Sequence, residues 1–233
     1  MSHSRDLILA RLRNDRNPQE PGGERHGQTP PTSQPTAIND RPMVVEPADV
    51  ERLVSLLEAA KTLVVRSSTD AWPEHLHAAL LKAGPLPTNW LYSDRNPAGR
   101  RWIDYVSERA NIRATPYPER VEQFKQALFD AIDASITTTR GGIAATGSLL
   151  LVPTPDEPRL MSLVPPLHVA LLERSRIVSS LADVLIDPLL QGPPMPSNIV
   201  LISGPSKTAD IQQTLAYGAH GPKVLVVVLL EDA

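Results

Sequence analysis

The chain has 233 residues, enough for one large domain or two small ones, and 41% of them are hydrophobic, an ordinary share for a protein with a buried core. A net charge of -3 and an aromatic content of 4% argue against a nucleic-acid-binding surface. The absence of cysteine excludes a disulfide framework, a Cys-ligated iron–sulfur cluster, a zinc finger and a Cys nucleophile on this chain.

The first 46 residues differ in composition from the rest. Residues 1–13 predict a short amphipathic helix, centred on 6–13. Residues 14–46 are rich in Pro, Gly, Gln, Thr and charge, and they predict a flexible linker because they have too few apolar side chains to offset the entropy of ordering. We find no signal-peptide pattern and no apolar run of membrane-spanning length, so we expect a cytoplasmic protein.

From residue 47 onward, helical and strand-like segments alternate. This alternation is typical of βαβ units, and it predicts one α/β domain over 47–233 in which a mainly parallel sheet lies between helices on both faces. The first predicted elements are helices over 48–60, 72–83, 99–110 and 120–131, and strands over 62–65, 89–92 and 112–114.

In the second half of the chain, the regular alternation of predicted helices and strands stops. Two β-prone segments, 135–139 and 149–152, flank Gly-rich turns. The remaining predicted elements are a helical turn at 159–164, a strand at 167–172, a helix at 180–190, a strand at 199–202, a helix that starts at Pro205, and a final strand at 223–230.

The segment from Ser203 to Asp210 is the first candidate site. Gly204 ends the preceding strand, and Pro205 suits the first turn of a helix. The free N–H groups of a helix N-terminus bind anions, to which Lys207 would add a positive charge. Ser203, Ser206 and Thr208 offer hydroxyls, and Asp210 would brace the turn. The alternative is a capped strand-to-helix corner that binds nothing, and the spacing is not that of a P-loop.

Two further segments contain candidate ligand-binding residues. The turn Thr146-Gly147-Ser148 offers hydroxyls and accessible N–H groups, although such residues are also common in purely structural turns. Arg159 has the fork geometry that pairs with a carboxylate, and its alternative is a solvated residue at a helix start. His168 enters an apolar strand, where a hydrogen-bonded core histidine is the commoner outcome.

The run SGPSKTADIQQTLAYGAHGP, residues 203–222, resembles the C-terminal signature of the lactate-utilisation protein C family, whose members are LUD-domain proteins. Residues 159–168 resemble the family's R-L-x-S-L-x-P-P-x-H segment, and 146–148 its TG-[TS] turn. Ala145 stands where the family often has Glu, which leaves this turn without a carboxylate.

The resemblance implies the fold of the NagB, ribose-phosphate isomerase and CoA-transferase superfamily. It also implies participation in the oxidation of L-lactate to pyruvate, beside partner proteins that carry iron–sulfur clusters. A chain without cysteine cannot hold such a cluster with thiolates, so we expect a subunit without a redox centre or cofactor of its own, which binds a small anionic ligand or the partner proteins. The alternative is a stand-alone enzyme that acts on phosphorylated or acyl substrates.

We expect one cleft at the carboxyl edge of the sheet, with the turns at 146–148 and 203–206 as its opposite walls. Lys207 or Arg159 would supply positive charge there. We assign no catalytic residue and predict no metal site. The candidate ligand-binding residues are Thr146, Gly147, Ser148, Arg159, Ser203, Gly204, Ser206, Lys207, Thr208 and Asp210.

Overall fold

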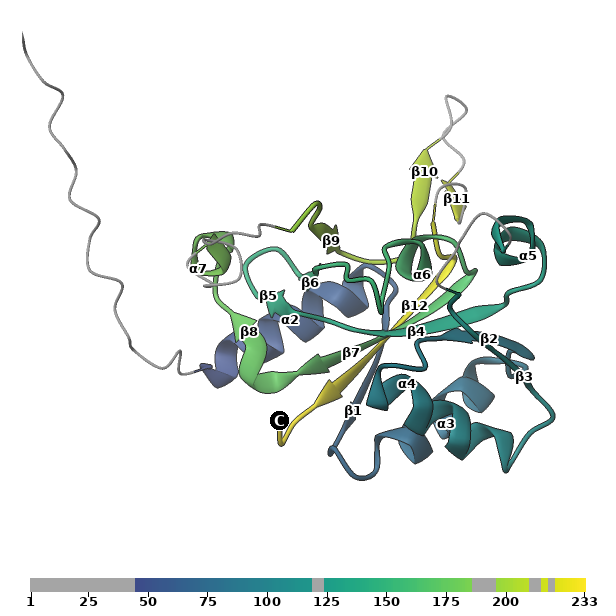
Figure 1. The fold of residues 1–233 in the computed structure, drawn as a ribbon. Helices are drawn as coiled ribbons and strands as arrows, with labels where there is room; N and C mark the ends of the chain where they lie inside the picture. The colour runs from purple at the N-terminus through teal and green to yellow at the C-terminus, as the bar shows by residue number, and fades with distance from the viewer. Residues whose placement is uncertain (1–44, 119–123, 186–195, 210–214, 218–220) are drawn as a thin grey trace, which may run out of the picture. The chain divides into compact units, whose positions relative to one another are not determined.

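The computed structural model describes residues 45–118, 124–185, 196–209, 215–217 and 221–233 (Figure 1). The predicted N-terminal helix and all but the last two residues of the predicted linker lie outside this part of the chain. Within the described ranges, no helix has both the length and the apolar composition needed to cross a membrane.

A six-stranded sheet forms the centre of the domain, and all of its strand pairs are parallel, as predicted. Two of its inner strands, residues 167–173 and 224–230, are almost entirely apolar because both faces of the sheet are covered. In spatial order the strands are β1 (Leu63–Ser67), β12 (Val224–Leu230), β7 (Leu167–Glu173), β4 (Ala134–Thr138), β2 (Asn89–Tyr92) and β3 (Arg113–Pro116).

One face of this sheet is covered by α3 (Trp72–Ala83) and α4 (Pro97–Ser107), which lie together in Figure 1. Trp72, Leu76 and Trp102 pack there against alternate residues of the strands, including Val226 and Val228. The side chains between them in sequence, such as Val227, point to the opposite face because successive strand residues alternate.

The opposite face is covered by α2 (Pro47–Ala59), by two short helices and by a second sheet. Leu53 and Leu57 of α2 pack there against Val227, with Leu149 of the second sheet in the same cluster. The short helices are α5 (Lys125–Asp130) and α6 (Leu160–Leu163). The second sheet has the order β8 (Ile177–Val178), β5 (Gly141–Ile143), β6 (Ser148–Leu151) and β9 (Val200–Ile202).

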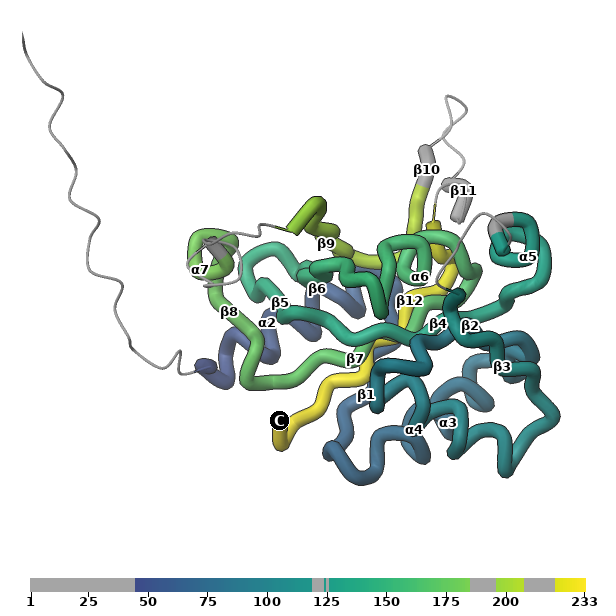
Figure 2. Tube along the Cα trace, viewed as in Figure 1, coloured from purple at the N-terminus to yellow at the C-terminus, as the bar shows by residue number. Residues whose placement is uncertain are grey.

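Chain order and spatial order differ at the middle of the central sheet. The last strand, β12, lies between the first strand and β7, and the tube in Figure 2 shows this yellow segment crossing the centre of the domain. The C-terminal segment therefore contributes core rather than surface, which agrees with the complete burial of Val226 and Val228.

Several predicted boundaries differ from the structure. The helix α5 begins at Lys125, with residues 119–123 outside the described ranges, and α7 (Leu181–Leu185) is the described part of the helix predicted over 180–190. The Gly-rich segment at 141–143 is a strand rather than a turn. A Cβ on Gly142 would lie 2.6 Å from a methyl carbon of Leu53, so the absence of a side chain lets α2 pack close to β5.

The helix predicted to start at Pro205 is wrong. Residues on both sides of the 210–214 gap form a hairpin of β10 (Lys207–Ala209) and β11 (Leu215–Tyr217), paired antiparallel with Lys207 opposite Tyr217. Gly204 and Pro205 end the preceding strand as expected, but such a break is equally compatible with a turn into another strand. The structure therefore provides no helix N-terminus at Ser203–Lys207 for an anion.

Candidate ligand-binding site

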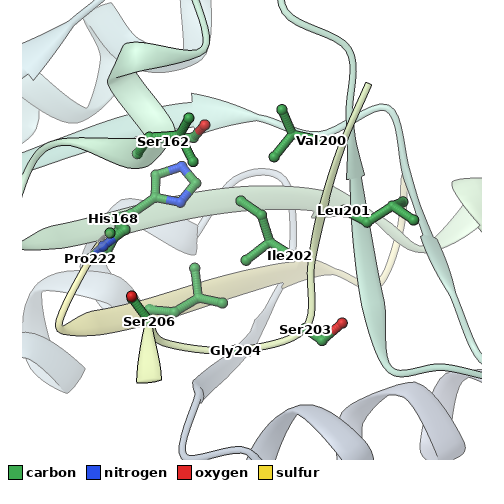
Figure 3. A pocket seen from close by; sticks show the side chains of 12 residues that line it. Ser162, His168, Val200, Leu201, Ile202, Ser203, Gly204, Ser206 and Pro222 are labelled. Carbon is green, nitrogen blue, oxygen red and sulfur yellow. The ribbon is translucent and has the colours of Figure 1, made fainter. Parts of the chain in front are cut away.

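A pocket of about 180 Å³ lies where the second sheet meets the amino-terminal ends of β7 and β12 (Figure 3). We call it the His168 pocket. Its wall combines three serine hydroxyls and one imidazole with aliphatic side chains. The lining residues are Ser162, Leu163, His168, Val200, Leu201, Ile202, Ser203, Gly204, Ser206, Gly221, Pro222 and Leu225.

Three separate segments of the sequence converge on this pocket. Ser162 and His168 come from α6 and the start of β7, Ser203 and Ser206 follow β9, and Pro222 precedes β12. In the close-up, the imidazole of His168 lies among Ser162, Ile202 and Ser206 (Figure 3). These are the segments that resemble the R-L-x-S-L-x-P-P-x-H and SGPS…HGP motifs, so the motifs share one location in the fold.

The segment after β9 is held at both ends. β9 pairs with β6, and the hydroxyls of Ser148 and Ser203 are 2.7 Å apart, which joins the two small-residue turns. At the other end, the backbone N–H of Ser206 donates to the carbonyl of Pro222 at 2.9 Å. The position of the pocket wall is therefore fixed by backbone pairing and one hydroxyl pair rather than by flexible side chains.

Two glycines bring these turns close to α2. Gly147 has a φ of +63° and Gly204 a φ of +147°, conformations that disfavour other residues. A Cβ on Gly147 would overlap Leu56, and one on Gly204 would lie 2.9 Å from the Cβ of Ala60. Because positions four apart lie on one face of a helix, both turns pack side by side against the C-terminal end of α2.

The pocket lies at the amino edge of the central sheet and not at the predicted carboxyl edge. Gly204 lies against Thr62, which precedes β1, and Ser206 is bonded to Pro222, which precedes β12. Strands that run parallel begin at the same edge of a sheet. The expected position is therefore wrong, because the strand that leads into the turn, β9, pairs with β6 in the second sheet and is not a strand of the central sheet.

The candidate residues divide into three groups. Ser203, Gly204 and Ser206 line the pocket. Thr146, Gly147 and Ser148 do not line it: the hydroxyl of Thr146 donates to Ser148, which is 4% exposed and supports Ser203 from behind. Arg159 and Lys207 are exposed and outside the lining, whereas Asp210 and the side chain of Thr208 lie outside the described residues.

His168 has a more unusual environment than a hydrogen-bonded core histidine. Its side chain is 0% exposed, and its Nε2 atom lies 2.9 Å from the hydroxyl of Thr137 on the neighbouring strand. Its Nδ1 atom is buried and has no hydrogen-bond partner in the described part of the chain. Burial lowers the pKa of His168 to about 3, so the ring is neutral at physiological pH.

A second polar cavity, of about 300 Å³, lies at the carboxyl edge, beside the ends of β2 and β3. The order in which successive strands are added to the sheet reverses between β2 and β4, and open α/β sheets commonly bind ligands at such a point. The lining residues are Ser93, Asp94, Arg95, Pro116, Tyr117, Pro118, Pro155 and Asp156.

Glu157 follows Asp156 at the wall of this cavity, and sequence reasoning missed it. Its carboxylate accepts hydrogen bonds from the N–H of Thr138 at 3.1 Å, the hydroxyl of Thr138 at 2.5 Å and the side-chain amide of Asn96 at 2.9 Å. Burial raises the pKa of Glu157 although these donors oppose the shift. The only signal in the sequence was a pair of acids between prolines, which is also typical of an exposed loop.

The sequence of this chain is similar to that of a known protein family. The sequence model of the LUD domain matches residues 50–230. An uncharacterized protein of Neisseria meningitidis is 44% identical over 121 residues, 52% of each chain. Lactate utilization protein C of Bacillus subtilis is 30% identical over 132 residues, 55% of this chain and 54% of the relative, and the uncharacterized protein YkgG of Escherichia coli is 34% identical over 117 residues, 49% and 48%.

These alignments span about half the length of the curated relatives. A crystal structure of a DUF162 family protein from Deinococcus radiodurans superposes with a TM-score of 0.53 over 78% of this chain and 96% of that one, at 17% sequence identity, which supports the fold alone. The residues matched by the LUD model include the central sheet, the second sheet and the His168 pocket. The chain therefore belongs to the LUD domain family.

Proposed function

We propose that this chain is a subunit of an L-lactate-oxidising system, that it has no redox centre of its own, and that it works beside partner proteins that carry iron–sulfur clusters. The proposal is supported by its similarity to relatives named lactate utilization protein C and by the absence of cysteine. Within the system, the chain binds a small ligand in the His168 pocket.

The observation that carries the proposal is the convergence of the three motif segments on this pocket. Residues that served only packing would not need to leave a polar atom unpaired, because a buried donor or acceptor without a partner costs about 1–3 kcal/mol. The Nδ1 atom of His168 is such an atom. A ligand that bonds to it would recover this free energy, which is the physical basis for binding.

Growth on L-lactate as the sole carbon source tests the function. Deleting the gene from its host should abolish this growth and leave growth on glucose unchanged, and the wild-type gene should restore it. Ser206→Phe, which fills the pocket, should fail to restore growth, whereas Ser197→Phe, at an exposed serine outside the pocket, should succeed. Both variants would first be checked for wild-type thermal unfolding.

The isolated chain provides a second test of the same proposal. It should bind no iron, show no visible absorption and turn over no lactate with artificial electron acceptors, because it has no thiolate ligands. The tagged chain should co-purify from lactate-grown cells with iron-containing, cysteine-rich proteins. Unimpaired lactate growth of the deletion strain, or lactate turnover by the isolated chain, would refute the proposal.

Glu157 favours a second candidate function, a stand-alone enzyme that acts on phosphorylated or acyl substrates. Such an enzyme needs a carboxylate or base in its site, and a half-buried carboxyl with a raised pKa beside a cavity is suited to proton transfer. This candidate predicts that Glu157→Gln abolishes hydrolysis or transfer on a panel of phosphate esters and thioesters, while Asp156→Asn retains it. Absence of any activity in the wild-type chain would exclude this candidate.

A further inference from the structure

Building on the proposed function, we infer that the His168 pocket binds a small organic acid together with one proton, which the ligand's carboxyl group and the Nδ1 atom of His168 share. The ligand class is a short carboxylic acid whose remaining atoms are hydroxyl, keto or methyl groups. The free chain and the free anion would together hold one proton fewer than the complex, and the missing proton would come from the solvent.

The first argument is the absence of a compensating cation. Among the described residues that line the pocket, His168 is the sole ionisable side chain, and lysine and arginine are absent from this part of the lining. Of the serine hydroxyls, Ser162 donates to the carbonyl of Arg159 and Ser203 is paired with Ser148. A carboxylate that entered this wall unprotonated would lose its hydration without a counter-ion, and such burial is strongly unfavourable.

The second argument is the geometry of His168. Its Nε2 atom is committed to Thr137, so Nδ1 is the ring atom left for a ligand. If the proton resides on the ring, an imidazolium–carboxylate pair forms; if it resides on the acid, the carboxyl O–H donates to Nδ1. Both arrangements contain the same atoms and the same net charge. The hydroxyl of Ser206 makes no hydrogen bond within the described ranges and supplies a further polar contact.

Within the described ranges, the elements packed against His168 supply no other titrating group. The side chains that face His168 from β4, β12 and α6 are Ser135 and Thr137, Leu225, and Ser162, none of which is charged. The nearest charged residues in sequence to the lining are Arg159, Lys207 and Lys223, and all three are exposed. Solvent and salt screen such charges, so they attract anions to the opening without replacing the proton inside.

The inference sets the pH dependence of binding. At pH values above the carboxyl pKa of the free acid and below the pKa of the complex, the dissociation constant should rise about tenfold per pH unit, because one proton is taken up for each ligand bound. A pocket that bound the anion through fixed cations or backbone groups would show a dissociation constant that stays constant over the same range.

Isothermal titration calorimetry of the full-length chain tests whether binding takes up a proton. L-Lactate and pyruvate serve as probes from pH 5 to 8, at each pH in two buffers that have capacity there and different ionisation enthalpies, which reveals proton uptake. We expect uptake of about one proton per ligand at pH 7. We also expect the dissociation constant to rise about tenfold for each unit by which the pH is raised. His168→Gln retains an amide that can reach Thr137, and it should abolish the uptake. His75→Gln, at an exposed histidine, should not change it.

Binding without proton uptake, or uptake that persists in His168→Gln, would overturn the inference and leave the proposed function standing. Failure of both acids to bind at every pH would also overturn it, and the growth experiment would then decide the proposed function separately. If His168→Gln fails to fold, Ser206→Ala replaces it: this variant should bind more weakly and still take up one proton.

Discussion

His168 lies in an apolar strand, with one ring nitrogen bonded to Thr137 and the other buried with no partner among the described residues. Burial disfavours the charged ring, so the folded state binds its proton only near pH 3, whereas the unfolded chain binds it near pH 6.5. Since the folded state holds fewer protons between these values, stability must decrease as the pH falls through this window, and the effect is absent above it.

The low pKa of His168 predicts how the stability of the protein depends on pH. Between about pH 6 and pH 4, His168 should cost the wild-type chain about 1.4 kcal/mol of unfolding free energy per pH unit. His168→Gln cannot titrate and should lose stability less steeply. Urea denaturation at pH 7, 6, 5 and 4.5 measures both profiles, and groups such as Glu157 contribute equally to each. Parallel profiles would show that His168 titrates normally in the folded protein.

Gly147 tests the packing behind the pocket. Gly147→Ala places a Cβ at a positive φ and against Leu56, so we expect a loss of about 1–3 kcal/mol or more in unfolding free energy. Gly84→Ala is the matched control, because a Cβ there meets nothing within 4 Å and the backbone is extended. Guanidinium denaturation of both variants measures the difference. Equal stabilities would contradict the described turn at 146–148.

At the scale of elements, β10 and β11 are where local sequence signals and structure disagree. Position 208 lies opposite position 216 in the antiparallel pair. Opposed residues in such a pair have Cα atoms about 4.5–5.5 Å apart, within the range of a disulfide, whereas eight residues of helix would separate them by about 12 Å. β10 and β11 arise because they pair with each other, an interaction that the local sequence preferences of either segment do not contain.

A disulfide therefore distinguishes hairpin from helix. The double variant Thr208→Cys, Ala216→Cys adds the only cysteines in the chain, and it should oxidise to an intramolecular disulfide under mild conditions. Mass spectrometry with and without reductant measures the bond, and the two single-cysteine variants serve as controls for intermolecular products. Two free thiols in the folded double variant would support the helix instead.

For the whole molecule, the composition of residues 14–42 predicts a segment without core contacts. Limited proteolysis should cut the full chain there first, and should leave a resistant fragment that begins near Met43 and includes α2. Intact mass spectrometry of the time course identifies the fragment, and its thermal unfolding should match that of the full chain. First cleavage within the α/β domain would contradict this division.

The sequence by itself determined the α/β class, the parallel sheet and most of the elements from α2 to β7, because apolar residues at period 3.6 or in short β-branched runs specify which face of each element is buried. Its motif also singled out Ser203, Gly204 and Ser206, which line the His168 pocket. These are local properties, and they follow from backbone conformation and side-chain polarity.

Only the tertiary structure decided where the candidate residues lie and which side chains surround them. The pairing of β9 with β6 and the hydrogen bond from Ser206 to Pro222 placed the 203–206 turn at the amino edge of the central sheet. Strand neighbours far apart in sequence gave one ring nitrogen of His168 the hydroxyl of Thr137, and the other nitrogen has no partner among the described residues. Burial raises the pKa of Glu157 against the opposing effect of its hydrogen bonds from Asn96 and Thr138. Burial and unpaired polar atoms are products of long-range packing, which no local pattern of residues encodes.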